Sequence, residues 1–188
     1  MKRILSFWYL SAVLINIIAI SNNVQAQVTE DWATRYNGPS SGADQSNAIV
    51  VDNFGNVYVA GYSDGSTPFW DYATIKYDSV GVFQWVQRYN GSGSSFDVAY
   101  AIAVDHLGFI YVTGGSIGTG SNYDYLTIKY SSSGDTIWTR RYNGPKNGLD
   151  KAYSIVLDDT GNVYITGESE GLISTQGNNE DYATINYS

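Results

Sequence analysis

Cysteine is absent from the sequence, so no disulfide can stabilise the fold and thiol catalysis is excluded. The chain has a single histidine, His106, and a Ser-His-Asp triad would have to use that residue. Zinc, Walker and dinucleotide-binding patterns are absent as well. Carboxylate pairs of the kind used for glycoside cleavage are the catalytic groups that remain. No such pair stands out, and we single out no catalytic residue.

Basic residues are also scarce, with 10 lysines and arginines against 18 acidic residues and a net charge of −8. Nucleic acids and anionic membrane surfaces are recognised first by basic patches, so the charge argues against both as partners. Loss of Lys2 and Arg3 with the N-terminal segment described below would make the net charge −10. The acidity is typical of a soluble extracellular protein.

Prolines number only 3 and charged residues make up 15% of the chain, whereas aromatic residues reach 15% and glycines number 20. This composition predicts an all-β protein. Residues 1–26 differ: Lys2 and Arg3 precede an apolar run over 4–20, and Val24-Gln25-Ala26 is a small-residue cleavage site. The pattern predicts a signal peptide over 1–26, and an uncleaved membrane anchor is the alternative. We expect a secreted or cell-surface protein, with the periplasm as another location, and no membrane contact once processed.

The rest of the chain is a threefold repeat. Arg-Tyr-Asn-Gly occurs at 35–38, 88–91 and 141–144, a spacing of 53 residues. A tryptophan precedes each copy at the same distance, at Trp32, Trp85 and Trp138. Repeats of this length build solenoids, propellers or arrays, in which neighbouring units stack to form a core.

Each repeat predicts four antiparallel strands. In the first repeat these are 48–51, 57–61, 72–77 and 83–89, with Asp-x-x-Gly hairpin turns after the first and third strands. Gly55 and its counterparts Gly108 and Gly161 should adopt positive φ in these turns. Such a unit is one propeller blade. The repeats then lie near 48–89, 101–142 and 154–187, within a domain over 27–188.

Several spaced motifs together resemble the β-propeller repeat family called SBBP. They are DYATIKY at 71–77, a tryptophan-containing strand, RYNG, and then AIAVD with YVTG. The resemblance covers residues 31–188. It implies secreted bacterial proteins with propeller architecture, and it implies no defined activity.

The phase of the repeats is permuted by one strand. Residues 31–37 align with the fourth strand, and 182–187 align with the third. In closed propellers an N-terminal outer strand of this kind completes the last blade, so we expect 31–37 to be the fourth strand of the closing blade. Closed rings have four to eight blades. Either two chains form a homodimer with six blades, or the repeats continue in a longer chain.

The loops that precede the first strand of each repeat and follow the second are long and variable, and they should carry any binding function. Asp44, Asp97 and Asp150 occupy equivalent positions there. They could hold calcium, or each could accept hydrogen bonds from the backbone of its own loop, which we favour because all three repeats carry the residue. No other cofactor is indicated. Trp70 and Tyr123 lie in the same loops, where aromatic faces could stack on sugar rings.

Three functions remain open. The first is a non-enzymatic secreted scaffold for protein or cell-surface interaction. The second is a glycan-binding module that uses the loop aromatics and carboxylates. The third is a fragment of a lyase or glycosidase built on a propeller.

Overall fold

The computed structural model describes residues 28–65, 69–171 and 180–188, and a compact unit spans Asp31–Ser188. The expected signal peptide over 1–26 lies outside these residues, as do parts of the loops at 66–68 and 172–179. No helix in the described residues is long and apolar enough to cross a membrane.

The described chain is all-β and forms three antiparallel sheets that match the three repeats. The first sheet contains β1 (Asp44–Val51), β2 (Val57–Asp64), β3 (Trp70–Tyr77) and β4 (Phe83–Tyr89). The second contains β5 (Asp97–Val104), β6 (Ile110–Ile117), β7 (Tyr123–Tyr130) and β8 (Thr136–Tyr142). The third contains only β9 (Asp150–Leu157), β10 (Val163–Glu170) and β11 (Glu180–Tyr187). The predicted fold class is confirmed, and the sheets do not close into a ring.

The hairpin turns form as the Asp-x-x-Gly pattern predicts. Asp52 accepts hydrogen bonds at Oδ1 from the backbone N–H groups of Phe54 and Asn56, both at 2.9 Å, and Gly55 has a φ of 79°. Gly108 and Gly161 repeat this conformation, with φ angles of 83° and 89°. The turn aspartates are therefore structural residues, because their carboxylates satisfy N–H groups that the tight turn leaves unpaired.

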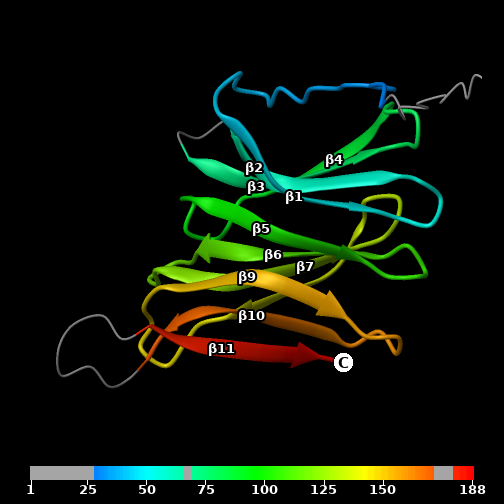
Figure 1. Cartoon of the computed structure of the whole chain (residues 1–188). Helices are drawn as coiled ribbons and strands as arrows, with labels where there is room; N and C mark the ends of the chain where they lie inside the picture. Colours follow the sequence, from blue (N-terminus) through cyan, green and yellow to red (C-terminus); the bar gives the residue numbers. More distant parts are fainter. Residues whose placement is uncertain (1–27, 66–68, 172–179) are drawn as a thin grey trace, which may run out of the picture. The chain divides into compact units, whose positions relative to one another are not determined.

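The sheets stack face to face in chain order, with β1, β5 and β9 following one another (Figure 1). Side chains of one sheet insert into the next. Tyr58 and Tyr72 of the first sheet are fully buried against Ile110, Leu126 and Ile128 of the second. Tyr111 and Tyr125 of the second sheet pack in the same way against the third. Burial of these large rings is the main contribution to holding the stack together.

The structure forms no strand over residues 31–37, where we expected the fourth strand of a closing blade. A strand needs a hydrogen-bonded neighbour, and no described strand pairs with this segment. Trp32 and Tyr36 instead pack against the first sheet, at Tyr77 and in the cluster that contains Val57 and Ile75.

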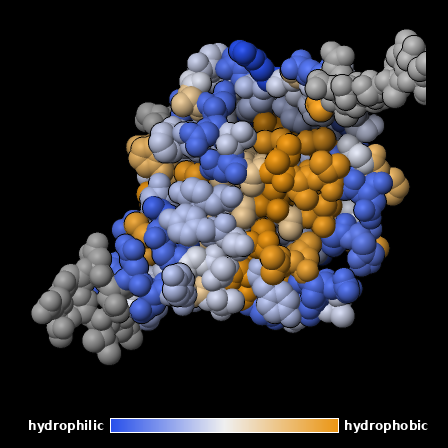
Figure 2. Space-filling model, viewed as in Figure 1, coloured by the Kyte–Doolittle hydropathy of each residue, from blue (hydrophilic) through white to orange (hydrophobic). Residues whose placement is uncertain are grey.

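Hydrophobic side chains also reach the surface of the stack. Figure 2 shows them gathered on the side where β1, β5 and β9 lie. Ile49, Val51 and Val156 of these strands are more than half exposed. In a closed propeller the first strand of each blade lies innermost, so this is the side that ring closure would shield from bulk water.

Candidate functional site

Three of the predicted site residues begin the first strand of each sheet. Asp44, Asp97 and Asp150 are the first residues of β1, β5 and β9, and they lie opposite Ser63, Ser116 and Ser169 in register. Asp97 and Asp150 are fully buried and Asp44 is half-buried. The strands begin four residues earlier than the sequence predicted, which moves these aspartates from the loops into the sheets.

Each of these carboxylates binds the backbone of its own loop. Oδ2 accepts a hydrogen bond from the N–H group of the glycine six residues earlier, at 2.9 Å for Gly38, 2.6 Å for Gly91 and 2.7 Å for Gly144. Those glycines end the three Arg-Tyr-Asn-Gly motifs, so each aspartate accepts a backbone hydrogen bond of the kind that the structural interpretation predicts. Burial raises the pKa of Asp97, and the hydrogen bond from Gly91 opposes this increase. Across the described parts of the chain, no three acidic or histidine side chains converge to hold a metal ion.

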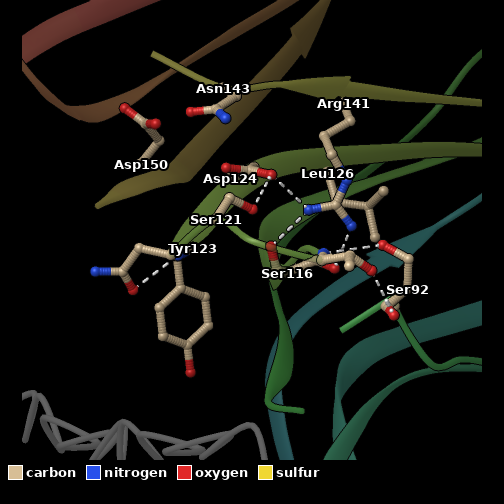
Figure 3. A network of polar contacts seen from close by, with 12 residues as sticks. Ser92, Ser116, Ser121, Tyr123, Asp124, Leu126, Arg141, Asn143 and Asp150 are labelled. Carbon is tan, nitrogen blue, oxygen red and sulfur yellow. Dashed lines mark hydrogen bonds and ion pairs between the residues drawn. The ribbon is translucent and has the colours of Figure 1, made fainter. Parts of the chain in front are cut away.

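A second carboxylate and an arginine extend this network across the sheet (Figure 3). Arg141 of β8 donates to Oδ2 of Asp124 at 2.9 Å, to the carbonyl oxygen of Ser116 at 2.7 Å and to the Ser116 hydroxyl at 2.7 Å. Arg88 of the first sheet binds Asp71 in the same way, at 3.0 Å. Each of these two arginines therefore pairs with a carboxylate of the neighbouring strand in its own sheet. Asp71 and Asp124 were not predicted as site residues, because their contacts with the arginines depend on the pairing of β3 with β4 and of β7 with β8.

Trp70 and Tyr123 are less available than their predicted loop positions suggested. They begin β3 and β7 and are half-buried. The Trp70 ring stacks on Tyr62 with a centroid distance of 4.3 Å and meets Phe96 edge-on at 5.0 Å. Lys151 Nζ lies 4.7 Å from the centroid of Tyr123, and burial raises the pKa of Tyr123 to about 12. Both rings therefore contribute to contacts between successive sheets.

A further set of side chains was not predicted. The pairing of β1 with β2 skips Asn47, the pairing of β5 with β6 skips Tyr100, and the pairing of β9 with β10 skips Tyr153. Each skipped residue is a β-bulge, which turns one additional side chain away from the regular alternation. We call these three residues the bulge row.

The bulge row crosses the sheets by direct contacts. The Asn47 amide donates to the carbonyl oxygen of Ala99 at 2.8 Å. The Tyr100 and Tyr153 rings lie 5.1 Å apart, and the Tyr153 hydroxyl donates to Glu168 Oε1 at 2.6 Å. Tyr153 remains 46% exposed. The row thus presents aromatic and amide groups to solvent on rigid strands, beside an acidic side chain.

The geometry of the sheets agrees with a comparison of the sequence with family models. The model described as a β-propeller repeat, SBBP, matches residues 31–69, 84–120 and 137–173. The chain belongs to this family. Each match to the SBBP repeat begins one residue before the repeated tryptophan, at 31, 84 and 137, so the family unit starts with the fourth strand and runs into the next sheet. No curated protein matches the chain.

Proposed function

We propose that this SBBP repeat protein is a non-enzymatic, secreted scaffold that binds a protein or a cell surface through the bulge row and the neighbouring aromatic side chains. The observation that carries the proposal is the exposed Tyr153 ring, which Tyr100 and Glu168 hold in a fixed orientation. Aromatic side chains held rigidly in this way bind partners at a low cost in conformational entropy.

The hydrogen bonding of the repeated polar residues supports a scaffold over an enzyme. Asp97 and Asp150 bind their own loops, and Asp124 binds Arg141. These carboxylates recur in register because every sheet needs them at the same place, so their presence is explained by the fold. A catalytic pair would instead be expected in one repeat, with carboxyl groups facing a shared cleft.

A glycan is the second candidate ligand. Sugar rings stack on aromatic faces, and their hydroxyl groups bind carboxylate and amide groups nearby. The surface offers both, since Tyr62 stacks on Trp70 and its hydroxyl donates to Gln45 Oε1 at 3.0 Å, while Glu168 accepts from Tyr153. Tyr153 and Glu168 line an open pocket on the face of the third sheet, which no further sheet covers in the described chain.

The test uses the purified protein, labelled with a fluorophore, and intact cells of the organism that produces it. We expect saturable binding to the cells, and replacing both Tyr100 and Tyr153 by alanine should weaken it by at least about 10-fold. Phe54→Ala is the control, because Phe54 is 81% exposed in the β1–β2 turn at the opposite end of the strands. Equal binding by the double variant and the control would contradict the assignment of the bulge row.

Treatment of the cells separates the two candidate ligands. Protease digestion of the surface should abolish binding if the partner is a protein, and periodate oxidation should abolish it if the partner is a glycan. A glycan array with the unmodified protein gives an independent answer. Failure of the protein to bind any cell surface or array would refute the proposal.

A further inference from the structure

Residues 31–37 occupy the place of a fourth strand, although they form none. Trp32 has its ring centroid 6.5 Å from Tyr77 and lies against Gly81, where an added Cβ would be 2.6 Å from the indole. Trp85 of β4 meets Tyr130 of the next sheet at 6.4 Å and lies against Gly134 in the same way. The N-terminal segment therefore packs on the first sheet as β4 packs on the second.

The polar contacts of residues 31–37 also match those of β4. Tyr36 accepts a hydrogen bond from Arg88 at 3.5 Å, and Tyr89 of β4 is the corresponding partner of Arg141 in the next sheet. The segment over 31–37 thus has the side-chain contacts of β4 with the following sheet, and lacks only a third strand to pair with along its backbone.

A third strand with an open edge lies at the other end of the stack. β11 is the outer strand of the third sheet, and residues 182–187 repeat residues 72–77 of β3 with one difference, Asn186 for Lys76. The environments differ sharply, because Tyr72 is fully buried whereas Tyr182 is 96% exposed. Tyr72 is covered by the following sheet, and nothing in the described chain covers Tyr182 in that way.

The open face of the third sheet, which carries Tyr182, is complementary to the open face of the first sheet. Inside the stack, Tyr72 of the first sheet inserts among Leu126 and Ile128 of the second and donates a hydrogen bond to the carbonyl oxygen of Leu126 at 3.2 Å. Tyr125 donates to the carbonyl oxygen of Ala183 at 3.1 Å. A groove of about 370 Å³ lies on the open face of the first sheet. It is lined by the first-sheet equivalents of the residues that receive these tyrosines, among them Val57, Val59, Ala73 and Ile75.

We propose that a second copy of this chain completes the third sheet. Residues 31–37 of the first copy add antiparallel to β11 of the second copy. Tyr182 of the second copy then enters the groove on the first sheet of the first copy. The pairing of β3 with β4 fixes the register, because Thr74 lies opposite Gln87 and Tyr72 opposite Tyr89. The equivalent pairs across the junction are Thr184 with Thr34 and Tyr182 with Tyr36.

Two copies would complete each other's third sheets, since each supplies residues 31–37 as a fourth strand and each has a third sheet of three described strands. The result is six sheets, which lies within the four to eight found in closed propellers. The same contact would also cover the open edge of β11, and exposed sheet edges are otherwise prone to uncontrolled pairing. Arg35 would then take, beside β11, the position that Arg88 and Arg141 hold beside β3 and β7.

Disulfide trapping tests the register directly, because the natural chain has no cysteine. The protein carrying both Thr34→Cys and Thr184→Cys should form a disulfide between copies under mild oxidation, since directly opposed strand residues bring their Cβ atoms within bonding range. The control carries Thr34→Cys and Ala183→Cys. Its second cysteine points to the other face of the sheet, so we expect little cross-linking.

Sedimentation of the unmodified protein gives the oligomeric state. A species of two chains, with cross-linking of the Thr34–Thr184 pair well above the control, is the expected result. Tyr182→Ser should weaken this dimer by at least about 10-fold, as for a central interface aromatic residue. Leu107→Ser should leave it unchanged, because Leu107 is 69% exposed in the β5–β6 turn. A monomer at all concentrations, or equal cross-linking of both cysteine pairs, would overturn the proposal and leave another polypeptide as the occupant of the β11 edge.

Discussion

Two tyrosines in the same sequence motif should respond very differently to the same substitution. Tyr72 and Tyr182 both stand in Asp-Tyr-Ala-Thr-Ile, but the first ring is fully buried between two sheets and the second is 96% exposed. We therefore expect Tyr72→Ala to destabilise the protein strongly and Tyr182→Ala to have almost no effect on the isolated chain.

The magnitude follows from the burial of Tyr72. A buried aromatic ring removes roughly 150–250 Å² from water, and truncating one to alanine in a packed core typically costs about 3–5 kcal/mol. Tyr72→Phe keeps the ring and removes only the hydrogen bond to the Leu126 carbonyl, which is worth about 0.5–1.5 kcal/mol. For Tyr182→Ala, a surface change, we expect about 0.5 kcal/mol or less.

Equilibrium urea denaturation, followed by tryptophan fluorescence, measures these differences. The protein must be dilute enough to be monomeric, because association through Tyr182 would add a concentration-dependent contribution to its stability. Similar losses for Tyr72→Ala and Tyr182→Ala would refute the reasoning, since the order of the sheets would then not determine which face of each repeat is covered.

Other substitutions probe the network, the turns and the tyrosines. Arg141→Met should cost about 2–4 kcal/mol, because it leaves the buried Asp124 carboxylate without its cation, whereas Arg140→Met on the exposed side should be nearly neutral. Gly161→Val should cost about 1–3 kcal/mol from backbone strain alone, since the φ is 89° and no atom lies within 4 Å of an added Cβ; an unchanged melting temperature would contradict the turn assignment. Burial raises the pKa of tyrosines such as Tyr125, so the folded state keeps protons that the unfolded state releases above pH ~10. The tyrosines should accordingly add no pH dependence below that pH, and stability should fall above it; equal urea midpoints at pH ~8 and pH ~11 would argue against this burial.

The sequence predicted the number of sheets, their strand order and the turn glycines because each of these is repeated three times in register. The beginnings of the first strands could not be predicted. A continuous apolar run marks the strand only from Ala48, because the four residues before it are polar and the bulge at Asn47 interrupts the regular pairing there. The same irregularity concealed Tyr100 and Tyr153, which the sequence places in loops and the structure places in strands.

The sequence predicted that repeated polar residues make hydrogen bonds, but it did not predict all of their partners. Three aspartates at equivalent positions indicated hydrogen bonds within their own loops, and the glycine N–H groups six residues earlier are the donors. The partners of Arg88 and Arg141 depend on which residue lies across the strand pair, and that register is a property of the sheet. The ion pairs of Asp71 and Asp124 could therefore be identified only from the pairing of β3 with β4 and of β7 with β8.

The difference between Tyr72 and Tyr182 shows why sequence could not settle the ends of the stack. Each repeat covers the one before it and is covered by the one after it, so the exposure of a residue depends on its repeat's neighbours as much as on its own sequence. Residues 31–37 and β11 have the sequences of paired strands, and within the described residues each lacks the neighbour that its sequence suits. A second copy supplies both neighbours at once, because the free strand of each chain is the one that the other chain's third sheet is missing. Mixing a chain that carries only Thr34→Cys with one that carries only Thr184→Cys should therefore give cross-linked pairs that contain one chain of each kind.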